Sequence, residues 1–145
     1  MNRLEATLLV SCLLALLPGA GVQDARASAA DETWSFAAPL SEFMARDEPL
    51  MLRNSESEFS VYVPISERIE VSEARLLLEF TNSISLIEER SQLRVGVNGR
   101  VVAQIPLSPR QPAVEAELPI PVRLLEPGFN RLTFSVAQHL SLIHI

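Results

Sequence analysis

The side chains that could perform acid–base catalysis are few, and their spacing forms no known catalytic site. Glu115 and Glu117 stand two residues apart in an alternating run, so both carboxylates would leave the same strand face. Glycoside hydrolysis needs two carboxyl groups facing each other across a sugar, about 5–9 Å apart. Adjacent Glu88 and Glu89 do not imply that geometry either. We therefore interpret both pairs as solvated surface and predict a non-enzymatic protein, with a small glycoside hydrolase as the enzyme alternative.

Metal and nucleophile chemistry is equally sparse. The sequence has one cysteine, Cys12, and two histidines, His139 and His144, and none of them belongs to a cluster with metal-ligand spacing. Glycine patterns typical of nucleotide-binding loops and of the serine-hydrolase elbow are absent. The net charge of −6 argues against a nucleic-acid-binding surface. The sequence thus predicts no cofactor, no metal and no nucleic-acid partner.

Three features suit binding rather than catalysis. Arg90 and Arg94 have an R-x-x-x-R spacing that can bracket phosphates, although a chain with 12 arginines produces such spacings by chance. Tyr62 lies opposite the apolar face of its own alternating run, so its ring is expected to point outward and could stack on a sugar. Trp34 is the second candidate for glycan stacking. The alternatives are an ordinary half-exposed strand tyrosine and a tryptophan that anchors a linker.

The elements that must position these residues are predicted to be β-strands. Ser91–Leu107 alternates apolar and polar residues around Asn98-Gly99, a pair suited to the type I′ turn of a tight antiparallel hairpin. Ten prolines and the lack of a long 3.6-residue period beyond the N-terminal run argue against a helical bundle. About seven short strands separated by turn residues indicate an all-β sandwich or barrel. The other predicted strands are Leu50–Leu52, Phe59–Val63, Ala74–Phe80, Val114–Leu118 and Leu132–Val136.

The N-terminus has the pattern of an export leader. Arg3 precedes the apolar run Ala6–Leu17, which predicts a helical signal peptide over residues 1–27, cleaved after Gly21 or Ala27. The run is shorter than the roughly 20 residues that span a bilayer, and an uncleaved anchor is the alternative. Cys12 falls inside this run, so the mature chain would contain no cysteine.

The remaining chain divides into three predicted parts. Residues 28–48 lack clear periodicity and are predicted to be a linker, and residues 49–139 are predicted to form the sandwich domain. Residues 140–145 match what the end of a common sequencing-library transposon encodes. We expect these six residues to be the non-native tail of a truncated reading frame, and the alternative is a genuine apolar terminus.

The order and spacing of several motifs across residues 49–139 resemble a known family. The chain is similar to the N-terminal periplasmic region of the bacterial cellulose synthase regulatory subunit, a family named for cyclic di-GMP binding. The motifs are an L-R pair, a strand that leads to a serine-rich loop, S-x-L-x-V-x-x-N, and a later N-x-x-x-F strand. They fall on Leu52-Arg53, on Ala74 to Ser85, on Ser91, Leu93, Val95 and Asn98, and on Asn130 and Phe134.

This resemblance implies a jelly-roll-like antiparallel β-sandwich of about seven or eight strands at the periplasmic face of the inner membrane. It implies a non-catalytic subunit that associates with the membrane glucosyltransferase subunit and assists translocation of the β-1,4-glucan chain. It also implies a C-terminal membrane anchor beyond this sequence and a full-length protein able to form homo-oligomers. Cyclic di-GMP enters only as a family-level association, because this domain is acidic and is expected outside the cytosol. The alternative is a free-standing periplasmic glycan-binding module of another exopolysaccharide system.

Overall fold

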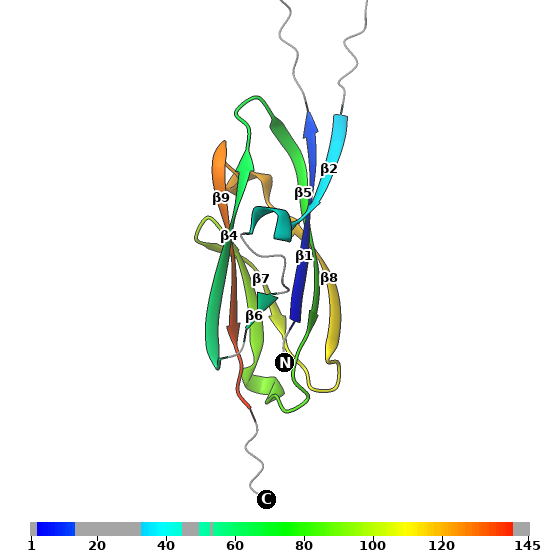
Figure 1. Cartoon of the computed structure of the whole chain (residues 1–145), viewed down its shortest axis with the longest axis vertical. Helices are drawn as coiled ribbons and strands as arrows, with labels where there is room; N and C mark the ends of the chain where they lie inside the picture. The colour runs from blue at the N-terminus through cyan, green and yellow to red at the C-terminus, as the bar shows by residue number, and fades with distance from the viewer. Residues whose placement is uncertain (1–2, 14–32, 45–49, 53, 141–145) are drawn as a thin grey trace, which may run out of the picture.

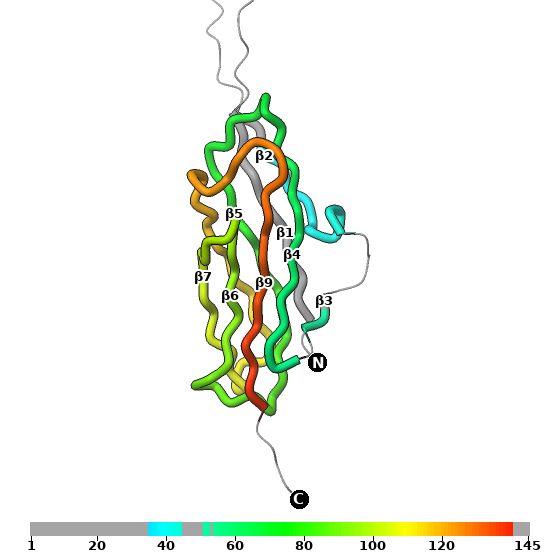
Figure 2. Tube along the Cα trace, turned by 90° about the vertical axis from the view of Figure 1, so that its left-hand side faces the viewer, coloured from blue at the N-terminus to red at the C-terminus, as the bar shows by residue number. Residues whose placement is uncertain are grey.

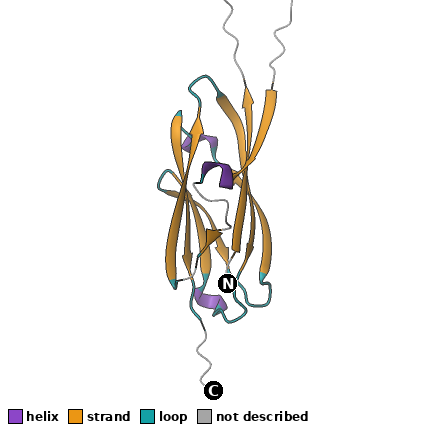
Figure 3. Ribbon diagram, viewed as in Figure 1, coloured by secondary structure: helices purple, strands orange, loops and turns teal. Residues whose placement is uncertain are grey.

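Two antiparallel β-sheets make up the fold in this computed structural model (Figure 1). The structure describes residues 3–13, 33–44, 50–52 and 54–140, and side chains over 35–44, 51–52 and 54–140. The described residues contain nine strands and three short 3-10 turns, η1 (Leu40–Phe43), η2 (Glu88–Arg90) and η3 (Val122–Leu124), and no α-helix (Figure 3). The all-β prediction is confirmed, and the finer jelly-roll-like description stays a prediction.

The four-stranded sheet has the order β4-β9-β6-β7 and forms one layer (Figure 2). The predicted hairpin is confirmed, since β6 and β7 pair through a two-residue turn in which Asn98 has φ 48° and Gly99 has φ 82°. Positive φ at both central positions is what a type I′ turn requires. The strand bounds are β4 (Glu56–Ile65), β6 (Gln92–Val97), β7 (Arg100–Pro106) and β9 (Gly128–Ala137).

The second sheet has the order β2-β1-β5-β8, and β3 pairs with the start of β1. In this sheet β1 lies between β2 and β5 and is antiparallel to both. Two of the pairs that β5 makes with β8 are Leu76 with Leu118 and Glu79 with Glu115. The bounds are β1 (Arg3–Leu13), β2 (Thr33–Pro39), β3 (Leu50–Met51), β5 (Glu70–Thr81) and β8 (Ala113–Ile120).

The hydrophobic core lies between the two sheets, as the alternating runs predicted. Successive side chains of a strand point to opposite faces, so one set of each strand is buried and the other faces outward. Leu76 is fully buried from one layer, and Phe134 is 1% exposed from the other. The predicted apolar faces supply most of the core, which includes Val61, Val63, Ala74, Leu76, Leu78, Phe80, Leu93, Val95, Val97, Leu132, Phe134 and Val136.

The N-terminal segments differ from the sequence prediction. Arg3–Leu13, for which the sequence predicts a helical leader, is the strand β1. A short apolar run is compatible with both a leader helix and a buried strand. Here its backbone pairs with β2 on one side and with β5 on the other. The predicted linker, residues 28–48, includes the strand β2, which pairs with β1, and the 3-10 turn η1.

Two expectations about the ends of the chain stay predictions. The cleavage positions at Gly21 and Ala27 and residues 141–145 lie outside the described residues. Within the described part of the chain, no helix is long and apolar enough to cross a membrane.

Candidate functional site

The outer face of the four-stranded sheet carries a continuous row of small and polar side chains. On this face Glu58 is opposite Ser135 and Ser60 is opposite Thr133, and the hydroxyls of Ser60 and Thr133 lie 3.2 Å apart in a hydrogen bond. On the other side of β9, Gly96 pairs with Thr133. The middle of the face is therefore flat, because Ser60 and Thr133 are small and Gly96 has no side chain.

One end of this face is aromatic. Tyr62 is 54% exposed and lies opposite Arg131, while Phe129 is 76% exposed and lies opposite Pro64. Residues diagonal to one another on paired strands are about 7–8 Å apart, so the Tyr62 and Phe129 rings occupy neighbouring positions. Exposed aromatic side chains that share one sheet face form a surface on which a sugar ring can stack.

The other end of the face is a polar hollow of about 470 Å³. Glu58 on β4 and Arg94 on β6 flank Ser135 on β9, so a carboxylate and a guanidinium stand on either side of a small floor. Such groups can donate to and accept from sugar hydroxyls. The residues that line the hollow are Glu56, Ser57, Glu58, Arg94, Ser135, Val136 and Ala137.

A side-chain network fixes the backbone at the aromatic end. Asn98 Nδ2 donates to Asn130 Oδ1 at 2.8 Å and to the carbonyl of Leu124 at 2.7 Å. Asn98 Oδ1 accepts from the backbone N–H of Arg131 at 2.8 Å. Asn130, only 1% exposed, also donates to the carbonyl of Glu126 and accepts from its N–H. The hairpin turn is thereby joined to the first residues of β9, which carry Phe129 and Arg131.

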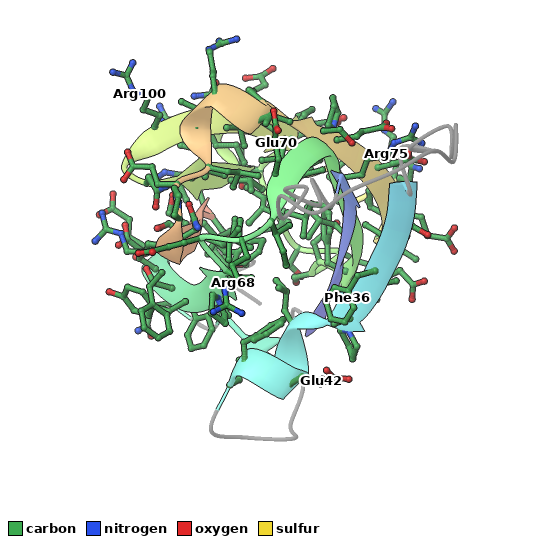
Figure 4. The ribbon with its side chains drawn as sticks, turned by 90° about the horizontal axis from the view of Figure 1, so that it is seen from above. Phe36, Glu42, Arg68, Glu70, Arg75 and Arg100 are labelled. Carbon is green, nitrogen blue, oxygen red and sulfur yellow. The ribbon has the colours of Figure 1, made fainter. Side chains whose placement is uncertain are left out.

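The outer face of the second sheet carries charged side chains instead. Arg75 donates to Glu73 Oε1 at 2.6 Å and to Glu117 Oε1 at 2.8 Å, and Figure 4 shows it on the outside of the sheet. The hydrogen bonds to Glu73 and then Glu117, together with their charges, raise the pKa of Arg75. This guanidinium therefore stays charged, and Glu117 is engaged in an ion pair rather than available as a catalytic acid or base.

A second hollow, of about 460 Å³, lies beside two carboxylates that sequence reasoning did not pair. Glu79 on β5 is directly opposite Glu115 on β8, and both line the hollow. Their side chains leave the same sheet face and would meet a substrate from one side, whereas glycoside hydrolysis needs carboxyl groups on both sides of the scissile bond. The described residues also contain no group of three or more His, Cys, Asp or Glu side chains placed to hold a metal ion.

The structure describes the side chains of all the sequence-predicted site residues except Trp34. Tyr62 is on the outer face with its ring exposed, as predicted. The Trp34 side chain lies outside the described side chains, so stacking by Trp34 stays a prediction. Arg90 lies in η2 and Arg94 in β6. Glu88, Glu89 and Glu115 are exposed, in agreement with solvated surface.

Sequence reasoning missed the partners of Tyr62 on this face. Phe129 and Arg131 are out of phase with the buried Leu132, Phe134 and Val136, so alternation along this run could have placed them outward. No local signal pairs Glu58 with Arg94, because their strands are joined only through β9.

Comparison with known proteins matches most of this fold to one family. Residues 33–143 match the model of the family described as cellulose synthase BcsB, first CBM domain. A relative named cyclic di-GMP-binding protein, from Pseudomonas fluorescens (strain SBW25), is 35% identical over 99 residues, which are 66% of this chain. The match covers 13% of that relative's length. The chain belongs to the family of first carbohydrate-binding-module domains of the cellulose synthase subunit BcsB.

Proposed function

We propose that this chain acts as a non-catalytic, periplasmic part of a bacterial cellulose synthase complex. In this role it associates with the membrane glucosyltransferase subunit and helps to guide the β-1,4-glucan chain during synthesis and translocation. The family match and the predicted export leader support this proposal. Glu117 is ion-paired, and Glu79 and Glu115 stand side by side on one sheet face, an arrangement that suits binding better than hydrolysis.

The glycan is proposed to lie along the outer face of the four-stranded sheet. The observation that carries this assignment is the exposed pair Tyr62 and Phe129 at one end of a flat face whose other end is a polar hollow. A glucan is flat and carries apolar C–H faces and equatorial hydroxyls along its edges. The aromatic end would contact the C–H faces of the glucan, and Glu58 and Arg94 would bind its hydroxyls.

A titration with a cello-oligosaccharide such as cellohexaose tests this face. Tyr62→Ala and Phe129→Ala are each expected to weaken binding several-fold, because each removes one stacking surface worth about 1 kcal/mol. Phe36→Ala is the matched control, since Phe36 is 44% exposed but lies on β2 of the opposite sheet (Figure 4). Absence of binding by the unaltered chain, or equal losses in all three variants, would contradict the assignment.

Membership of the synthase complex is tested separately in the cell. Deletion of the gene is expected to reduce cellulose output, and a chain with Tyr62→Ala and Phe129→Ala together is expected to restore it only in part. Normal cellulose output without the gene would instead favour a free-standing glycan-binding module of another exopolysaccharide system.

Nucleotide binding is not the role that these side chains favour. The name of the relative suggests cyclic di-GMP for that protein. In this chain Arg94 shares its outer-face row with Glu58, and Arg90 follows Glu88 and Glu89. A phosphate placed between the two arginines would meet this negative charge, which lowers its affinity.

A further inference from the structure

Arg131 is the charged residue of the aromatic end, and its backbone is held in place by the hairpin turn. It lies on β9 directly opposite Tyr62 on β4, and Phe129 is the neighbouring outward position on β9. Its N–H donates to Asn98 Oδ1 at 2.8 Å, and its carbonyl accepts from the N–H of Asn98 at 2.9 Å. Two hydrogen bonds to one residue thus fix the point from which this exposed side chain leaves the sheet.

The Arg131 guanidinium lies against the hairpin turn. Its Nη2 atom is 3.9 Å from the position that a Cβ on Gly99 would take, so the side chain reaches from β9 across to the end of β6. Arg100 follows Gly99 and is also exposed, and Figure 4 shows its guanidinium pointing away from the ribbon. Two arginines therefore lie at one turn beside the aromatic rings, and their like charges favour an anionic ligand there.

No carboxylate forms an ion pair with Arg131 among the residues that the structure describes. The described ion pairs belong to Arg75, on the opposite sheet. On the outer face of the four-stranded sheet, the nearest carboxylate along β4 is Glu58, four residues from Tyr62 and therefore about 13 Å away. This separation exceeds the Debye length of about 8 Å at physiological ionic strength, so Glu58 does little to reduce the positive potential at Arg131.

The overall negative charge of the chain does not prevent an anion from binding here. The net charge of −6 is spread over the whole chain, and salt screens charges that are exposed and farther away than the Debye length. A direct contact with a guanidinium is screened much less. Arginine also offers two parallel N–H donors to a carboxylate or phosphate, a geometry that a neutral hydroxyl cannot reproduce.

The rings and the guanidinium can act on one sugar unit. A pyranose stacked on Tyr62 or Phe129 through its apolar face carries its exocyclic groups at its edges. The edge that is turned toward β6 would face Arg131. A charged group at that edge would gain a contact that a neutral sugar lacks.

We propose that the aromatic end is a subsite for an acidic sugar unit, in which Tyr62 and Phe129 stack the pyranose ring and Arg131 binds its carboxylate or phosphate. This inference rests on the proposed function, because it takes the outer face of the four-stranded sheet as the glycan face. It goes further by assigning the class of glycan: a glucan that carries acidic groups binds this face more tightly than a neutral glucan.

Matched oligosaccharides test the preference for charge. The unaltered chain is titrated calorimetrically with cellohexaose, with cellohexaose whose terminal unit is oxidised at C6 to glucuronate, and with cellohexaose whose terminal unit carries a 6-phosphate. At least one acidic ligand is expected to bind about fivefold more tightly than the neutral one, with an advantage that shrinks as salt is added. The ligand with the larger advantage identifies the anionic group. Equal affinities for all three ligands would overturn the inference and leave the proposed function standing.

Substitutions of Arg131 assign the preference to this residue. Arg131→Met removes the guanidinium and keeps an apolar side chain, and the acidic and neutral ligands are then expected to bind equally. Arg131→Lys keeps the charge without the planar fork and is expected to recover only part of the advantage. Arg110→Met, at an exposed residue in the loop between β7 and β8, is the matched control and should retain it fully. An advantage that persists in Arg131→Met, or that is lost in Arg110→Met, would contradict the subsite.

The proposed function and the acidic subsite fail in different ways. Tyr62→Ala is expected to weaken the neutral and acidic ligands together, because both stack on the same ring. Binding of an acidic ligand alone, lost in Arg131→Met, would support the subsite and contradict a neutral glucan as the bound polymer. Absence of binding by all three ligands would overturn the glycan face and the subsite together.

Discussion

The Asn98 side chain donates to Asn130 Oδ1 at 2.8 Å, and this contact joins the turn of the β6–β7 hairpin to the start of β9. The two residues are 32 positions apart, and both are motif positions in the resemblance to the cellulose synthase subunit. A third motif residue, Ser91, accepts a hydrogen bond from the N–H of His139 at 3.1 Å. These three polar motif residues therefore hold the hairpin turn and the ends of β9 in place.

Substitution of Asn130 should destabilise the domain more than its size suggests. Asn130→Ala leaves the N–H and carbonyl of Glu126 without their side-chain partner at a buried position and removes one of the hydrogen bonds of the Asn98 amide. Loss of one side of a buried hydrogen bond costs about 1–3 kcal/mol. Urea unfolding measures this change, with the exposed Asn54→Ala as the control. Equal midpoints for the two variants would show that the network contributes nothing.

The two glycines of the hairpin should respond in opposite directions to alanine. Gly99 has φ +82°, so Gly99→Ala is expected to cost about 1–2 kcal/mol. Gly96 lies within β6, and a Cβ there would meet the Arg100 carbonyl oxygen at 3.4 Å and Thr133 Cβ at 3.7 Å, both ordinary contacts. Gly96→Ala is therefore expected to be neutral or stabilising by up to about 1 kcal/mol. Thermal unfolding of both variants decides the point, and a larger loss for Gly96→Ala would contradict it.

Local alternation was enough to place most of the core, and the Leu76 position tests this directly. Leu76 is fully buried between the sheets, so Leu76→Ala is expected to cost about 2–5 kcal/mol in unfolding free energy. Ile84→Ala, at a loop residue that is 75% exposed, should change stability by less than about 0.5 kcal/mol. Similar urea midpoints for both variants would be inconsistent with this core.

What local pattern could not supply is the pairing between distant strands. Tyr62 was placed outward correctly because its own run alternates, whereas its opposite residue Arg131 comes from a strand almost 70 positions away. The helical conformation predicted for Arg3–Leu13 is wrong for a related reason, since a continuous apolar run fits a leader helix and a central strand equally well, while its role as a leader stays a prediction. The turn at Asn98-Gly99 was predicted correctly because the requirement for positive φ at two successive residues is wholly local.

Removal of one carboxylate from the Glu79 and Glu115 pair should stabilise the protein. The two residues are directly opposite on β5 and β8, and like charges in that position are unfavourable by about 0.2–1 kcal/mol. Glu115→Gln keeps the shape of the side chain and removes its charge. Its gain in urea midpoint should be largest at low ionic strength and shrink in high salt. A gain that is independent of salt would point to a cause other than charge.

The polar hollow should contribute to glycan binding through Arg94 and Glu58, which stand on either side of Ser135. Hydrogen bonds to charged groups are worth about 1.5–3 kcal/mol, so Arg94→Met and Glu58→Gln are each expected to weaken cellohexaose affinity at least about tenfold. Arg110→Met is the control, because Arg110 is exposed in the loop between β7 and β8. Calorimetric titration measures affinity, and thermal unfolding of the same samples separates lost contacts from lost folding.

The two ends of the face should contribute independently to glycan affinity. Since Tyr62 and Phe129 lie at the far end of the face, the affinity losses on their substitution should add to those of Arg94 and Glu58, as independent sites do. Unchanged affinity in Arg94→Met and Glu58→Gln would confine the glycan to the aromatic end.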